Sequence, residues 1–160
     1  MIAPMENRVQ MVCSMFQPIT GQPLDIGKYE NRLMLQKIVY LAQSAGLGFG
    51  YNFSWYLRGP YCSELTKDYF DLVDAKPTIR PGSFIGREKS IIDALKGNFS
   101  KEVASDTGLE LLGSLVFVIR DMHVSQKAAA IEKLRSLKPW FTAEEIKEVY
   151  EKMEKSKLFN

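Results

Sequence analysis

The sequence predicts a mainly α-helical domain with a small β element. Two observations support this fold class: residues 35–72 follow a helix, strand, Gly-Pro turn and helix pattern, and most of the remaining chain has helical periodicity. The 160 residues are 46% hydrophobic and 25% charged, which is typical of globular proteins. A chain of this length buries about 70% of its unfolded surface, enough for one core without metals or disulfides. We therefore expect residues 1–160 to form a single domain.

The first helix of the 35–72 segment is amphipathic. Its apolar residues recur at intervals of three and four, which places them on one face: Met34, Leu35, Ile38, Leu41, Ala42 and Ala45. Arg32, Gln36, Tyr40 and Gln43 fall on the opposite, polar side, with Lys37 on its flank. Gly46 is expected to end this helix, because glycine tolerates a left-handed backbone.

A strand and a second helix follow. Apolar side chains alternate from Tyr51 to Leu57, the period of a strand with one apolar face, and Gly59-Pro60 is expected to stop this strand. A lone strand would leave backbone groups unpaired, so we expect a partner strand within residues 76–87. Ser63 is the predicted N-cap of the second helix, which carries the apolar stripe Leu65, Tyr69, Leu72 and Val73.

Further helices are predicted on both sides of this segment. They cover residues 5–16, 90–96, 107–121 and 126–137, with the apolar 107–121 helix at the centre of the core and Ser125 as the cap of the fourth. The last helix begins at Thr142, which forms a capping box with Glu145, while Phe141 and Ile146 form a hydrophobic staple. We expect its apolar face to be covered by the same chain, so that the protein is a monomer, with dimerisation as the alternative.

The motifs of residues 28–73 resemble those of a known family. LQKIVYLAQ, the aromatic strand and GPYCSEL, in this order, resemble the Panacea-type domain of bacterial and phage antitoxins (SocA-like proteins), and resemble the uncharacterised YwgA-like proteins more closely. The resemblance covers less than a third of the chain. It implies a winged-helix-like, mainly helical domain that binds another macromolecule, with residues 28–73 as its helix-strand-GPY-helix core. In the antitoxin relatives the implied partner is a toxin, which is neutralised or presented to a protease.

The sequence offers few groups for catalysis. His123 is the only histidine, and Cys13 and Cys62 lack the spacing of a zinc site or a disulfide framework. No enzyme activity, catalytic residue, metal or cofactor is therefore expected. An enzyme built on Cys62, at the start of a helix and paired with His123, is the lowest-ranked alternative.

Two surfaces are candidates for binding a macromolecule. The first, predicted to bind a protein partner such as a toxin, joins the polar helix face Gln36, Lys37 and Tyr40 to Arg58 and Tyr61 at the Gly-Pro turn; an ordinary solvated helix face is the competing interpretation. The second is a basic, Pro/Gly-rich segment, the expected wing of a winged helix, and would make the protein a DNA-binding transcriptional regulator. Its basic residues are Lys76, Arg80, Arg87 and Lys89, and an ordinary solvated loop is the competing interpretation.

The net charge favours a protein partner over DNA, and the hydropathy of the chain argues against a membrane role. The net charge of the whole chain is only +2, so no broad basic footprint for nucleic acid is present. Residues 1–10 lack a secretory signal pattern, and the most apolar run, residues 111–119, is too short to span a bilayer. We therefore expect a cytoplasmic protein-interaction or antitoxin-like regulatory module without a membrane role, and DNA binding is the second candidate.

Overall fold

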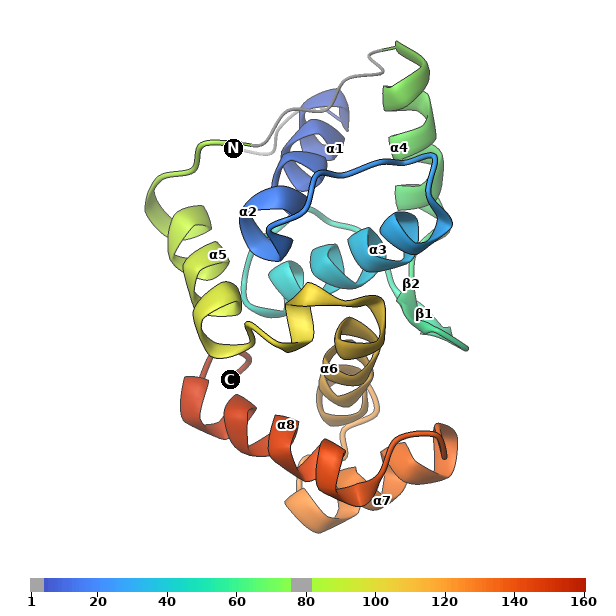
Figure 1. Cartoon of the computed structure of the whole chain (residues 1–160), viewed down its shortest axis with the longest axis vertical. Coiled ribbons are helices and arrows are strands. Elements are labelled where there is room, and N and C mark those ends of the chain that lie inside the picture. Colours follow the sequence, from blue (N-terminus) through green and yellow to red (C-terminus); the bar gives the residue numbers. More distant parts are fainter. Residues whose placement is uncertain (1–4, 76–81) are drawn as a thin grey trace.

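Two helices, α3 (Tyr29–Ser44) and α6 (Asp106–Arg120), pack together at the centre of the computed structural model, which describes residues 5–75 and 82–160 (Figure 1). The apolar stripe of α3 is buried, as its spacing predicted. Helix α6 is buried over most of its length, including Leu112, Leu115 and Val116. The prediction that the 107–121 segment is the central core helix is therefore confirmed.

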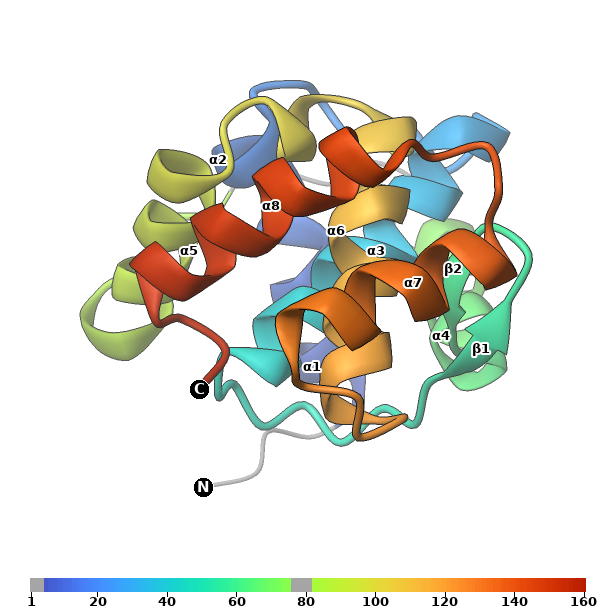
Figure 2. The same ribbon diagram turned by 90° about the horizontal axis from the view of Figure 1, so that it is seen from below.

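The other helices surround this central pair. They are α1 (Met5–Ser14), α2 (Phe16–Thr20), α4 (Ser63–Ala75), α5 (Gly86–Asn98), the 3₁₀ helix η1 (Glu102–Ala104), α7 (Lys127–Leu137) and α8 (Ala143–Ser156). Helices α1 and α4 pack against each other on one side, while α7 and α8 cover α6 on the other (Figures 1 and 2). Within the described ranges, none of these helices combines the length and the apolar character needed to cross a membrane.

The β element is a hairpin between α3 and α4. Strands β1 (Ser54–Tyr56) and β2 (Gly59–Tyr61) are antiparallel, with Trp55 opposite Pro60. The mainly helical fold with a small β element is thus confirmed, but two predictions about the strand were wrong. Gly59-Pro60 begins a second strand, and β1 pairs with this strand rather than with residues 82–87; the rest of the predicted partner segment, residues 76–81, lies outside the described residues.

A glycine permits this tight reversal of the chain. Leu57 and Arg58 form the two-residue turn, and the left-handed backbone falls on Gly59, with φ of 115°. A Cβ at Gly59 would lie 3.2 Å from Lys37 Cε, so the buried lysine side chain or the hairpin would have to shift by a few tenths of an ångström. The hairpin therefore turns back at once and lies closely on α3.

Several predicted helix ends are confirmed and others shift. Thr142 and Glu145 form the predicted capping box at the start of α8. The N-terminal helical segment is divided at Met15 into α1 and α2. Gln126, not Ser125, caps α7, because its side chain accepts a hydrogen bond from the Ala129 amide.

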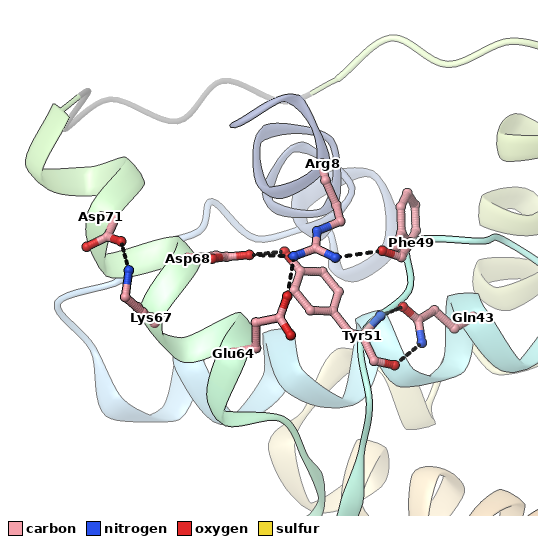
Figure 3. Close-up of polar contacts among 8 residues, drawn as sticks. All are labelled: Arg8, Gln43, Phe49, Tyr51, Glu64, Lys67, Asp68 and Asp71. Carbon is pink, nitrogen blue, oxygen red and sulfur yellow. Dashed lines mark hydrogen bonds and ion pairs between the residues drawn. The ribbon is translucent and has the colours of Figure 1, made fainter. Parts of the chain in front are cut away.

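A cluster of polar contacts ties α1 and α4 to the chain that leads into the hairpin (Figure 3). The Arg8 guanidinium of α1 donates to Glu64 at 2.6 Å and Asp68 at 3.0 Å on α4, and to the Phe49 carbonyl at 3.0 Å. The same guanidinium lies 4.0 Å from the centre of the Tyr51 ring, whose hydroxyl donates to Asp68. The segment that leads into the hairpin, which contains Phe49 and Tyr51, is therefore fixed by contacts with α1 and α4.

Candidate functional site

An open hollow of about 510 Å³ lies between the N-terminal part of α3 and the hairpin. Its lining residues are Tyr29, Leu33, Gln36, Lys37, Tyr56, Leu57, Arg58, Gly59, Pro60 and Tyr61. We refer to this feature as the hairpin hollow. It brings together four of the five residues predicted to bind a protein partner, namely Gln36, Lys37, Arg58 and Tyr61.

The three residues of α3 that were predicted to bind a partner are buried, although the sequence predicted an accessible face. Gln36 and Lys37 are each 1% exposed and Tyr40 is 5% exposed. The hairpin and α6 both pack on α3 and remove these side chains from solvent. The prediction was wrong because periodicity separates polar from apolar positions but does not reveal which later segment covers the polar ones.

Two glutamines of α3 hold the two ends of the hairpin segment. The Gln36 amide forms a pair of hydrogen bonds with the backbone of Cys62: its Nε2 donates to the carbonyl at 3.0 Å and its Oε1 accepts from the N–H at 2.8 Å. Gln43 forms the same pair with the backbone of Tyr51, both at 2.9 Å. Each side chain therefore satisfies a backbone donor and acceptor as a neighbouring strand would, which fixes the hairpin on α3.

Lys37 forms a buried ion pair beneath the hollow. Its ammonium donates to Oδ1 of Asp106, in the first turn of α6. Arg58 approaches the other oxygen, Oδ2, at 3.9 Å. Burial lowers the pKa of Lys37 below its ordinary value, and the hydrogen bond and charge of Asp106 partly oppose this shift.

A second buried ion pair lies one helical turn further along α6. Lys138 donates to Glu110 at 3.2 Å, and the Trp140 indole N–H donates to the same carboxylate oxygen at 3.0 Å. Burial lowers the pKa of Lys138, while Glu110 opposes the shift. Both carboxylates on this side of α6 therefore have cationic partners within the chain.

The rim of the hollow is apolar and accessible. Tyr29 and Tyr56 are more than half exposed, and Leu57 at the tip of the hairpin is 72% exposed. Tyr56 meets Tyr61 edge to face, with 5.1 Å between ring centres. Sequence reasoning predicted Tyr61 but missed Tyr29, Tyr56 and Leu57; for Tyr56 and Leu57 the available signal was two large apolar side chains next to each other just before Arg58-Gly59-Pro60, where a strict strand alternation would place a polar residue.

Tyr40 belongs to the core rather than to the hollow. Its hydroxyl donates to Asp121 at 2.6 Å, and its ring packs edge to face on Phe53 at 5.4 Å. Burial, together with this hydrogen bond, raises the pKa of Tyr40. Its assignment to the partner-binding surface is therefore corrected: Tyr40 is a packing residue on the opposite half of α3.

The basic segment does not supply the predicted wing where the structure describes it. Lys76 and Arg80 lie outside the described residues, whereas Arg87 and Lys89 lie on α5, which begins at Gly86. Lys89 pairs with Asp93 one turn later, at 2.7 Å. The observed hairpin comes before α4, not after it. The prediction of a wing was therefore wrong for residues 86–89, which form the first turn of α5.

The groups considered for cysteine chemistry lie in different settings. Cys62 is buried under the hairpin, and His123 lies in the exposed connection after α6 with φ of 59°. No hydrogen bond joins them among the described contacts, and no group of three or more metal-binding side chains was found within residues 5–75 and 82–160. Cys13 is also buried, and desolvation raises the pKa of its thiol to about 12.

Comparison of the chain with protein-family models, with curated proteins and with solved structures gave no match.

Proposed function

We propose that this protein is a binding module that holds a segment of a partner protein in the hairpin hollow. One observation carries the proposal: large apolar side chains, Tyr29, Tyr56 and Leu57, surround an open concavity instead of joining the core. Tyrosine and arginine are the residue types that dominate binding energy at protein interfaces. Leu57, which is 72% exposed in the turn of the hairpin, is available to pack against a partner.

The rigidity of the hairpin supports the same proposal. Gln36 and Gln43 fix its two ends on α3, and Arg8 holds the approach to it. A surface that is already ordered loses little conformational entropy on binding. The hairpin hollow is therefore suited to recognising a partner without first having to fold.

A regulatory role in the cytoplasm is part of this proposal. Both cysteines are free and buried, which suits a reducing compartment. The resemblance of residues 28–73 to antitoxin domains makes a toxin the first class of partner to test. A DNA-binding regulator is the alternative, and it would depend on the basic residues Lys76, Arg80, Arg87 and Lys89 rather than on the hollow.

Affinity capture with matched variants tests this proposal. The baits are the unaltered protein, the double variant Tyr56→Ala, Leu57→Ala, and the control Ile85→Ala, whose side chain is 81% exposed outside the hollow. Each bait is incubated with native lysate, with and without nuclease treatment, and retained proteins are identified by mass spectrometry. We expect one protein to be retained by the unaltered and control baits and lost by the double variant.

Binding of that protein is then measured with purified components. A partner that the double variant retains would place the interface elsewhere and contradict the proposal. Retention that disappears for all baits after nuclease treatment would favour the DNA-binding alternative. Circular dichroism of the three baits checks that the substitutions leave the fold intact.

A further inference from the structure

The charges around the hairpin hollow are unequal. Among the residues that the structure describes, its lining contains two cationic side chains, Lys37 and Arg58, and no carboxylate. Lys37 is already paired with Asp106 beneath the lining and is almost inaccessible. Arg58 is therefore the lining residue whose charge is directed to the solvent side.

Arg58 retains most of its hydrogen-bonding capacity. Its side chain is 56% exposed, and its single described ion pair, with Asp106, is 3.9 Å long, beyond hydrogen-bond distance. A guanidinium carries five N–H donors in a planar fork that matches the two oxygens of a carboxylate. The guanidinium thus lies in the lining of the hollow with its donors largely unused in the described contacts.

The surrounding charges do not satisfy this arginine. Asp106 is held by Lys37, and Glu110 is held by Lys138 and Trp140. The cluster therefore contains three cations and two carboxylates, which leaves one positive charge in excess. That excess lies at Arg58, the only one of the three cations that is substantially exposed.

We propose that the hairpin hollow recognises a partner segment that presents an aspartate or glutamate to Arg58 beside a large apolar side chain. The carboxylate completes the charge balance of the cluster, and the apolar side chain packs on Leu33, Leu57 and Pro60 between the tyrosine rings. This inference rests on the proposed protein-binding function and adds the chemistry of the partner.

The lining favours a protein carboxylate over the phosphates of a nucleic acid. Nucleic-acid grooves follow the backbone with several cations, whereas this hollow exposes one. Six of its other lining residues are leucine, proline or tyrosine, and the polar Gln36 and Lys37 are buried and hydrogen-bonded within the chain. A single charge within an apolar concavity matches one acidic residue within an apolar segment.

Selection from a random peptide library displayed on phage tests the proposed chemistry. The baits are the unaltered protein and the charge-reversed variant Arg58→Glu. We expect peptides selected by the unaltered protein to contain Asp or Glu next to a leucine or an aromatic residue. The reversed variant is expected to select Lys or Arg at the corresponding position, because the charge it faces has changed sign.

The strongest selected peptide is then synthesised and its affinity is measured by fluorescence anisotropy. We expect Arg58→Ala to weaken binding by about tenfold to a hundredfold, the range for hydrogen bonds between charged groups. Arg135→Ala is the matched control, since Arg135 is 50% exposed and also has a 3.9 Å ion pair, with Glu132 on α7. This control is expected to bind as the unaltered protein does.

The outcomes separate this inference from the proposed function. Selected peptides without acidic residues that still lose binding in the Tyr56→Ala, Leu57→Ala variant would overturn the acidic specificity and leave the protein-binding function in place. Failure to select any peptide, or selection unaffected by either substitution, would overturn both. A single-stranded oligonucleotide is tested in the same anisotropy assay. If it binds and Arg58→Ala abolishes this binding, the ligand of the hollow is a nucleic acid and not an acidic peptide.

Discussion

Lys37 shows how a single residue couples the hollow to the core. Its ammonium is removed from water, which is costly, and Asp106 compensates for this cost by an ion pair and a hydrogen bond. Gly59 allows the hairpin to close over the lysine side chain. Stability near the hollow therefore depends on the two partners remaining together.

Removing only one partner of this pair should be costly. We expect Lys37→Met to lower the free energy of unfolding by about 3 kcal/mol, because Asp106 is left buried without its close cation. The double variant Lys37→Met, Asp106→Asn should recover much of this loss. Lys133→Met, on the exposed side of α7, is the control for denaturant unfolding. A loss below about 1 kcal/mol in the single variant would show that water reaches Asp106.

The stability contributed by Lys37 should depend on pH. Because its pKa is lowered in the folded state, the unfolded chain binds more protons between that pKa and the ordinary value of 10.5. The difference in unfolding free energy between the unaltered protein and Lys37→Met should therefore increase as the pH rises through this interval. Denaturant titrations of both proteins at a series of alkaline pH values measure this difference in unfolding free energy. A difference that falls with rising pH would mean that the ion pair raises the pKa instead.

At the scale of elements, α3 serves as the support of the binding surface. Gln36 and Gln43 are seven residues apart, about two helical turns, so both point to the same side and meet successive parts of the hairpin segment. The helix thereby replaces the additional strand that a two-stranded hairpin ordinarily needs for stability. Two amide side chains thus fix both ends of the β element on α3, and α6 packs on β2 as well.

Each glutamine should protect its own backbone partner. We expect Gln36→Leu to accelerate hydrogen exchange of the Cys62 amide at least tenfold, since that N–H loses its acceptor, while the Tyr51 amide changes less. Gln43→Leu should have the reverse effect. Amide exchange followed by NMR resolves the two sites. Equal acceleration of both amides in either variant would show that the hairpin opens as one unit.

At the scale of the whole molecule, the apolar face of α8 is covered by its own chain. Ile146, Val149 and Met153 are buried, and α8 packs on α5, α6 and α7. The sequence prediction that this face is covered within the chain is confirmed. No second copy is needed to remove it from water, which supports the expectation of a monomer.

Charges placed on this face should unfold the protein rather than dissociate it. We expect the unaltered protein to sediment as a monomer, and the double variant Ile146→Asp, Met153→Asp to be a monomer destabilised by more than about 3 kcal/mol. Lys147→Asp, on the exposed side of α8, is the control. Sedimentation velocity and thermal unfolding measure the two effects. A dimer that the double variant converts into a folded monomer would contradict this assignment.

Local chemistry explains which predictions from sequence were correct. The α8 capping box depends on residues within one turn, and the apolar stripes of α3 and α6 follow from spacing along a single helix. The hairpin was harder to predict, because Gly59-Pro60 is compatible both with ending a strand and with starting an edge strand. Pairing across a two-residue turn decided between these alternatives.

The sequence by itself determined the helical class, the core faces and four members of the hollow, because periodicity and turn residues act over short distances. The tertiary structure alone decided that Gln36 and Lys37 are buried, that Tyr40 lies outside the hollow, and that Asp106 of another helix pairs with Lys37 beneath it. These outcomes depend on contacts between residues as far apart as Lys37 and Asp106. The residue pattern of one helix does not reveal which distant segment will bury its side chains or provide an ion-pair partner.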